Sequence, residues 1–243
     1  NKYYKQINYG RFQLNKQLNV NETLEIITKK SNIDYRITII EGWEKYQLDK
    51  YLSQFYENFE RLNYNELIAD TYLINSSNSF VDFKKFMHTS KDNFFKKHKA
   101  NKLLQNYGAE KILILSSLVE KEAKDNADKL LIASVILNRL NKKMKLQIDA
   151  TVIAAITKGE YKFNRKLTYK DLKIQDEINT YFIKGLPKEM ISYVGKDTIE
   201  IVLKNPKSDF LFYFYNILEN KHIYSKSFNE HKTKLNGYRK KIK

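Results

Sequence analysis

The stretch of residues 112–151 constrains the fold most, because its apolar residues recur at helical spacing for long enough to form two core helices. Glu122 continues one apolar face of the first helix, which also carries Ile112, Leu115 and Val119. Glu120 is turned well away from that face, toward solvent or the wall of a cleft. The pattern therefore predicts a helix with a carboxylate on its buried side.

A carboxylate on a buried face is costly unless it is paired or protonated, so Glu122 requires an explanation. One interpretation is a structural ion pair with Arg139 or Lys145. The other is a general acid whose pKa is raised by burial. The residues by themselves leave both interpretations open.

A polar cluster follows the second helix, which the sequence places from Asn126 or Asp128, either of which can cap it. Gln147, Asp149 and Thr151 lie within a few residues of one another. Their side chains suit hydrogen bonding to a ligand rich in hydroxyl groups. An ordinary turn with an Asx cap before the next helix explains them equally well.

Several motifs, in the same order along the chain, resemble those of the MltG (YceG-like) family of endolytic murein transglycosylases. The central ones read SLVEKEA at 117–123, IASVILNRL at 132–140 and MKLQIDATVI at 144–153. Others are Asp70-Thr-Tyr72, Asn179-Thr-Tyr181, Gly185-Leu-Pro187 and the pair Glu230-His231 near the end. The resemblance covers roughly residues 70–238, and Gly42-Trp43 matches a further element upstream.

The chain departs from the family pattern at five positions. The family's L-Q-T-D-P-T reads Leu-Gln-Ile-Asp-Ala-Thr here, so Ile148 and Ala150 replace Thr and Pro. Ile178 replaces a Tyr, and Lys188 and Val194 each replace a Pro. These changes leave the acid, Gln147, Asp149 and Asn179 in place.

The resemblance implies an α+β protein with two domains. A small LysM-like βααβ domain is expected over residues 1–64, and a mainly helical catalytic domain with a β-hairpin over residues 65–243. The patterns predict strands at residues 11–18 and 35–40, a long helix at 80–106 and the hairpin between residues 210 and 225.

The resemblance also implies a lyase rather than a hydrolase. Lytic transglycosylases use one carboxyl group, which protonates the glycosidic oxygen and then deprotonates the C6 hydroxyl of N-acetylmuramic acid. The predicted reaction cuts MurNAc-GlcNAc bonds within nascent strands and leaves 1,6-anhydro-MurNAc ends.

Glu122 is the expected catalytic acid and Glu120 the second choice. Gln147, Asp149, Asn179 and Tyr181 are expected to contact sugar or orient the acid. A glycan-binding scaffold without activity is the alternative, which the changed Thr and Pro positions permit.

The amino-acid composition limits which classes of binding partner and cofactor the chain can have. A net charge of +16, from 44 Lys and Arg against 28 Asp and Glu, favours anionic partners. A basic nucleic-acid-binding protein is therefore a second rival, but the lysines are scattered and no nucleic-acid motif is present. An anionic membrane surface and the carboxylates of cell-wall peptides are also compatible. The absence of cysteine excludes disulfides and a Cys nucleophile, and the four histidines lack ligand-like spacing, so no metal or other cofactor is expected.

The expected location follows from the resemblance. No apolar run reaches the roughly 18 residues that span a bilayer. The resemblance implies a single membrane anchor before Asn1, with the catalytic body in the periplasm, outside the bacterial inner membrane. It also implies peptidoglycan strands as substrate and cell-wall synthases, the penicillin-binding proteins, as neighbours.

Overall fold

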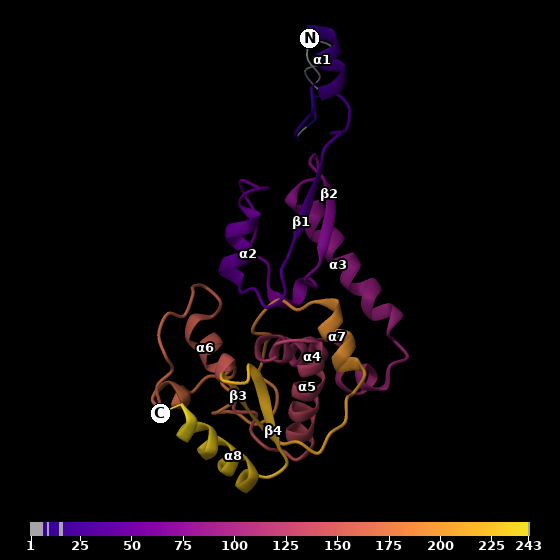
Figure 1. The fold of residues 1–243 in the computed structure, drawn as a ribbon. Coiled ribbons are helices and arrows are strands. Elements are labelled where there is room, and N and C mark those ends of the chain that lie inside the picture. The colour runs from indigo at the N-terminus through magenta and orange to yellow at the C-terminus, as the bar shows by residue number, and fades with distance from the viewer. Residues whose placement is uncertain (1–6, 9, 15–16, 243) are drawn as a thin grey trace.

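The computed structural model describes residues 7–8, 10–14 and 17–242, and these mix helices with two small antiparallel sheets (Figure 1). This confirms the α+β class. The first elements are α1 (Val20–Ile27), β1 (Asp34–Thr38), α2 (Lys45–Leu52), the 3-10 turn η1 (Tyr64–Glu66), β2 (Thr71–Asn75) and α3 (Phe80–Lys97). The remainder are α4 (Lys102–Glu122), α5 (Asn126–Asn141), α6 (Asp149–Thr157), the 3-10 turn η2 (Asp171–Lys173), α7 (Lys196–Leu203), β3 (Phe212–Asn216), β4 (Lys221–Ser225) and α8 (Phe228–Lys241).

The first sheet pairs β1 with β2, with Ile37 opposite Tyr72. One α-helix, α2, and the turn η1 lie between these strands in the sequence. Because β2 comes after residue 64, the sheet extends beyond the expected first domain, and the division at residue 64 stays a prediction.

The prediction of a strand at residues 11–18 is wrong for the described part of that range. Strands need hydrogen-bonding partners along the backbone. The backbone N–H of Arg11 instead donates to the hydroxyl of Ser76 at 3.1 Å, and its carbonyl accepts from the hydroxyls of Ser31 and Ser76. Side chains thus satisfy the groups that a partner strand would have bonded.

The long helix predicted to residue 106 ends at Lys97 as α3. The chain turns there, and the Asn101 side chain caps a new helix by accepting the N–H groups of Leu103 and Leu104 at 2.9 and 3.1 Å. Gly108, with φ of 76°, interrupts α4 near its start. The apolar pattern extends across this break, because both helices bury residues in one core.

Helix α4 is central to the helical part of the fold, where it packs against α5 and α7. Its apolar face is fully buried at Ile112, Leu115 and Val119, as the helical spacing predicted. The cap of α5 is Asp125, not the predicted Asn126 or Asp128, because the Asp125 carboxylate accepts the N–H of Asp128 at 2.9 Å.

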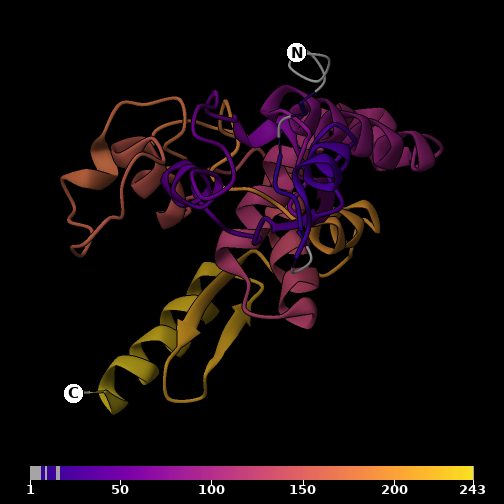
Figure 2. The same cartoon turned by 90° about the horizontal axis from the view of Figure 1, so that it is seen from above.

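The predicted hairpin is present as β3 and β4, with Tyr215 opposite His222. Helix α8 lies against both strands, and the hairpin and α8 project together from the body of the molecule (Figure 2). No helix within the described residues combines the length and apolarity that crossing a bilayer requires.

Candidate active site

Glu122 is the last residue of α4, and its side chain is partly exposed. The hydroxyl of Tyr213, on β3, donates a hydrogen bond to Glu122 Oε2 at 2.9 Å. The end of the central helix and the hairpin therefore meet at this carboxyl group. An acid that is largely enclosed but still reachable suits proton transfer to a bound ligand.

Burial raises the pKa of Glu122, and the nearby carboxylate of Asp149 acts in the same direction. The hydrogen bond from Tyr213 and the proximity of His222 oppose this increase without cancelling it. The C-terminal end of a helix carries partial negative charge, which further disfavours an anion there. Glu122 therefore holds its proton to a higher pH than an ordinary glutamate.

The ion pair considered for Glu122 is not found within the described residues. The Arg139 guanidinium donates instead to the carbonyls of Leu211 and Leu146, both at 2.6 Å, and the Lys145 ammonium donates to the carbonyl of Tyr181 at 2.8 Å. Both cations therefore bind backbone carbonyls, and the side chain that binds Glu122 is Tyr213.

The sequence placed Glu120 toward solvent or the wall of a cleft, but the side chain is enclosed, with 7% of it exposed. It forms an ion pair with Lys129 of α5 at 2.8 Å and accepts the hydroxyl of Thr198 of α7 at 2.5 Å. The helical spacing placed Glu120 correctly away from the face of Glu122, but α7 covers the side on which it lies. Glu120 joins three helices.

Asp149 and Tyr181 lie together near the acid. The Tyr181 hydroxyl donates to Asp149 Oδ1 at 2.6 Å, and burial, this hydrogen bond and the charges of Asp149 and Glu122 raise the pKa of Tyr181. Asp149 is the first residue of α6, and the cap before it, Ile148, makes no side-chain hydrogen bond. The Asx cap considered from the sequence is thus not formed.

Gln147 and Asn179 occupy different environments. Gln147 is exposed, with φ of 52°, and its N–H donates to the Thr180 carbonyl at 3.2 Å. Asn179 is fully buried and donates to the carbonyls of Leu172 and Ile174 at 3.1 and 2.8 Å. Its side-chain oxygen accepts the N–H of Tyr181 at 2.9 Å, so Asn179 fixes the loop that carries Tyr181.

The sequence did not single out Tyr213 or the group that attaches its hairpin to α5. Asp128 accepts from His222 Nδ1 at 2.8 Å and from the Tyr224 hydroxyl at 2.5 Å. His222 and Tyr224 alternate along β4 and so share a face, which was the available signal. Their partner on α5 is 94 residues from His222, and no local pattern reports such a distance.

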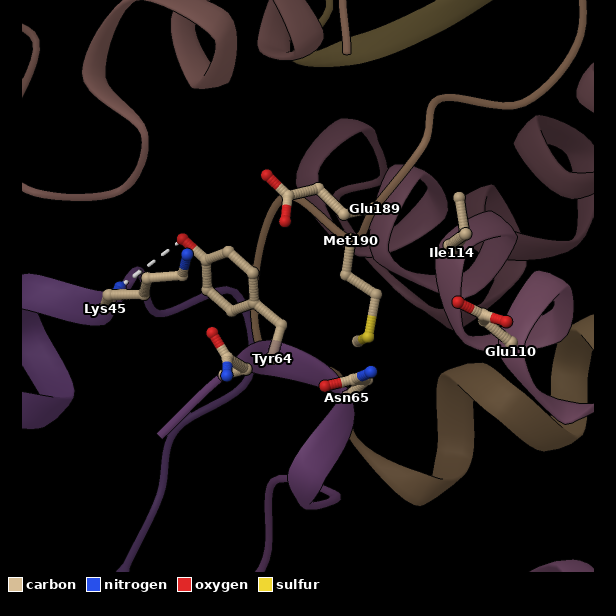
Figure 3. A pocket seen from close by; sticks show the side chains of 8 residues that line it. Lys45, Tyr64, Asn65, Glu110, Ile114, Glu189 and Met190 are labelled. Atoms are coloured by element: carbon tan, nitrogen blue, oxygen red, sulfur yellow. Dashed lines mark hydrogen bonds between the residues drawn. The ribbon is translucent and has the colours of Figure 1, made fainter. Parts of the chain in front are cut away.

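A separate pocket of about 160 Å³ lies between α4 and the segment that contains α2 and η1 (Figure 3). Lys45 and Tyr64 line it from one side and Glu110 and Ile114 of α4 from the other. None of the predicted site residues lines this pocket. The described residues contain no group of three or more acidic, His or Cys side chains suited to hold a metal ion.

The sequence matches the YceG-like family over residues 1–236. It is 35% identical to the endolytic murein transglycosylase of Bacillus subtilis over 68% of this chain and 45% of that protein. The endolytic murein transglycosylase of Streptococcus pneumoniae serotype 2 is 29% identical over 68% of this chain and 30% of that protein. The chain thus spans less than half the length of these curated relatives.

The fold is similar to the crystal structure of a yceG-like protein from Listeria monocytogenes. The two share a TM-score of 0.70 and 27% sequence identity, over 96% of this chain and 87% of that one. The family match covers nearly the whole chain, and so does the structural likeness. The chain therefore belongs to the YceG-like family.

Proposed function

We propose that this chain is an endolytic murein transglycosylase that cleaves MurNAc-GlcNAc bonds within nascent glycan strands without consuming water. The observation that carries the proposal is Glu122, a partly exposed carboxyl at a helix end whose pKa burial raises. The names of the curated relatives support the substrate class. A single acid of this kind suffices when the nucleophile belongs to the substrate.

In the first step, protonated Glu122 gives its proton to the glycosidic oxygen as the bond from C1 of N-acetylmuramic acid breaks. Burial raises the pKa of Glu122, which favours the protonated form that this step requires. The leaving sugar departs with a hydroxyl group, and an oxocarbenium-like centre develops at C1. Glu122 is left as a carboxylate that still accepts a hydrogen bond from Tyr213.

In the second step, the Glu122 carboxylate removes the proton from the C6 hydroxyl of the same muramic acid residue. The C6 oxygen then bonds to C1 and closes the 1,6-anhydro ring. Glu122 ends the cycle protonated, as it began, so atoms and charge balance without water. Tyr213 holds the carboxyl group in one orientation through both proton transfers.

Four further residues have proposed roles around the reacting sugar. The exposed Asp149 carboxylate, oriented by Tyr181, stabilises positive charge near C1. Gln147 contacts sugar hydroxyl or N-acetyl groups from the exposed loop before α6. Asn179 acts indirectly, because its buried amide fixes the loop of Tyr181.

The proposed setting is the outer side of the cytoplasmic membrane, where nascent strands are made. The relatives' names concern a cell-wall polymer, which lies outside the cytoplasm. Cell-wall synthases and an N-terminal membrane anchor belong to the same proposal and rest on the family resemblance.

The test is digestion of nascent, uncrosslinked glycan strands by the wild-type chain, Glu122→Gln and the matched control Glu110→Gln, which changes an exposed glutamate on the same helix. Mass spectrometry should find new ends lighter by one water with the wild type and Glu110→Gln, and none with Glu122→Gln. Hydrolysed ends would contradict the transglycosylase reaction. Intact strands that the wild type binds would favour the glycan-binding scaffold instead.

A further inference from the structure

The far end of the hairpin exposes apolar side chains that have no role in the core. Ile217 and Leu218 are the first two residues of the turn between β3 and β4, with 71% and 59% of their surfaces exposed. Ile242, directly after α8, is 51% exposed. Asn220, with φ of 50°, supplies the conformation that the turn requires, so the Ile-Leu pair has no conformational reason to be there. We call these three residues the apolar tip.

The end of α8 lies beside the hairpin turn (Figure 2). The rings of Phe214 on β3 and Tyr238 on α8 are 5.5 Å apart, which fixes the helix along the strand. The hydrogen bond from Lys221 lowers the pKa of Glu219 in the turn, and the charge of Lys241 adds to this effect. The hairpin turn and the C-terminal end of α8 are thus close in space.

Positive charge surrounds the apolar tip. The last turn of α8 contains Arg239, Lys240 and Lys241, and β4 begins with Lys221. The acidic residue in the turn, Glu219, is already in an ion pair with Lys221 at 2.8 Å. Because Glu219 and Lys221 neutralise each other, we call the three cations of α8 the basic rim. The combination of exposed Ile and Leu with Lys and Arg is typical of segments that lie at a membrane interface.

We propose that the apolar tip and the basic rim dock onto the surface of an anionic phospholipid bilayer. The apolar side chains enter the boundary between headgroups and acyl chains, and the basic rim contacts lipid phosphates. A small, projecting tip favours a lipid surface over a protein partner, because stable protein interfaces bury about 800 Å² on each side. This inference is independent of the proposed cleavage, since none of these residues contacts Glu122.

The experiment is co-sedimentation of the 243-residue chain with phosphatidylcholine vesicles that contain or lack phosphatidylglycerol. The wild type should bind only the anionic vesicles, and salt should weaken this binding. Each basic side chain near such a surface contributes roughly a fivefold factor. Arg239→Gln/Lys240→Gln/Lys241→Gln should weaken binding roughly a hundredfold, and Ile217→Ser/Leu218→Ser about tenfold or more.

Matched controls distinguish binding through the tip from binding that depends only on the total charge or the total exposed apolar surface of the chain. Lys162→Gln/Lys166→Gln/Lys170→Gln removes the same charge, and Val81→Ser/Tyr169→Ser removes exposed apolar groups elsewhere. Both should bind anionic vesicles like the wild type. Equal binding to neutral vesicles, equal loss in the controls, or unchanged binding by the tip variants would overturn the proposal.

Cleavage of soluble strands distinguishes this proposal from the proposed function. The tip variants should cleave soluble strands at the wild-type rate, and Glu122→Gln should bind anionic vesicles normally. A tip variant that binds normally but loses cleavage would overturn the assignment of the tip to lipid. Loss of cleavage in Glu122→Gln alone leaves the lipid proposal unaffected.

Discussion

Glu122 is a carboxyl group held where its charged form is disfavoured. It lies at the C-terminal end of α4, partly enclosed, and its hydrogen-bond donor is a tyrosine rather than a cation. The helical spacing of apolar residues around it predicted its face correctly. The sequence offered Asn179 two roles, contact with sugar or orientation of the acid, and its fully buried amide, bonded to the backbone, supports an indirect role.

The raised pKa of Glu122 predicts a pH-dependent cost to stability. Its folded pKa lies above the ordinary value of 4.5, so the folded chain binds more protons and loses stability as pH rises from that value through the folded pKa. Glu122→Gln removes this loss. Urea denaturation at a series of pH values should show the variant gaining stability over the wild type as pH rises. A pH-independent difference would contradict the shift.

Tyr213 should act as a positioning residue for Glu122. Tyr213→Phe removes the donor at 2.9 Å, which loosens the carboxyl group and raises its pKa further. A hydrogen bond to a charged group contributes about 1.5–3 kcal/mol, so kcat should fall roughly tenfold to a hundredfold. The alkaline limb of the rate profile should also move to higher pH.

The control for Tyr213 is Tyr215→Phe, which removes a hydroxyl from the same strand that bonds to Asn220 in the exposed turn. It should keep both the rate and the pH profile. If Tyr213→Phe lowered kcat with no change in the profile, a purely structural role for the hydroxyl would be the better explanation.

At the scale of elements, the hairpin reaches the acid because α5 holds it. His222 and Tyr224 of β4 bind Asp128 of α5, and Arg139 of the same helix binds the carbonyl of Leu211 just before β3. Tyr213 is thereby fixed between two attachments to one helix. The alternating residues predicted the hairpin, but its attachment depends on side chains that meet only after folding.

Removing the Asp128 carboxylate should loosen the hairpin. Burial acts to raise the pKa of Asp128, but the hydrogen bonds from His222, Tyr224 and the Lys124 N–H outweigh it and lower the pKa below 3.8. The stabilisation is therefore present above that value and lost as pH falls through the folded pKa. Asp128→Ala should cost about 2 kcal/mol near neutral pH.

Hydrogen exchange measured across β3 and β4 checks this expectation, because a loosened hairpin exchanges its amides faster. The matched control is Asp92→Ala, which removes an exposed carboxylate from α3. It should leave both exchange and stability unchanged. Unaltered hairpin exchange in Asp128→Ala would show that other contacts hold the hairpin.

At the scale of the whole molecule, Glu120 joins α4, α5 and α7 into one body. Its carboxylate contacts Lys129 and Thr198, and the group is largely enclosed. Removing one partner of such a pair leaves an uncompensated charge. Glu120→Ala should therefore lower the free energy of unfolding by about 3 kcal/mol, measured by urea denaturation, whereas Glu110→Ala on the same helix should not.

Cleavage separates this structural role from catalysis. The folded fraction of Glu120→Ala should cut glycan strands at the wild-type rate, because Glu122 and Tyr213 are retained. A rate that fell as far as that of Glu122→Gln, in protein shown to be folded, would make Glu120 part of the reaction.

The sequence by itself determined the α+β class, through the family resemblance, and its repeats determined the rest: the central helices, the hairpin and the face on which Glu122 lies. The helices, the hairpin and the face of Glu122 follow from repeats of 3.6 and 2 residues, which are local properties of the chain. The helix boundaries near residue 100 were missed because one apolar pattern runs through α3 and α4, although Asn101 caps a new helix there.

Only the tertiary structure decided which side chains surround the acid. Tyr213 is 91 residues from Glu122 in the sequence, and the enclosure of Glu120 depends on where α7 packs. Such contacts arise from the packing of whole elements, whose geometry no short-range repeat encodes. The pKa of Glu122 is likewise set by burial, which exists only once the helix, the hairpin and the loop of Tyr181 have come together.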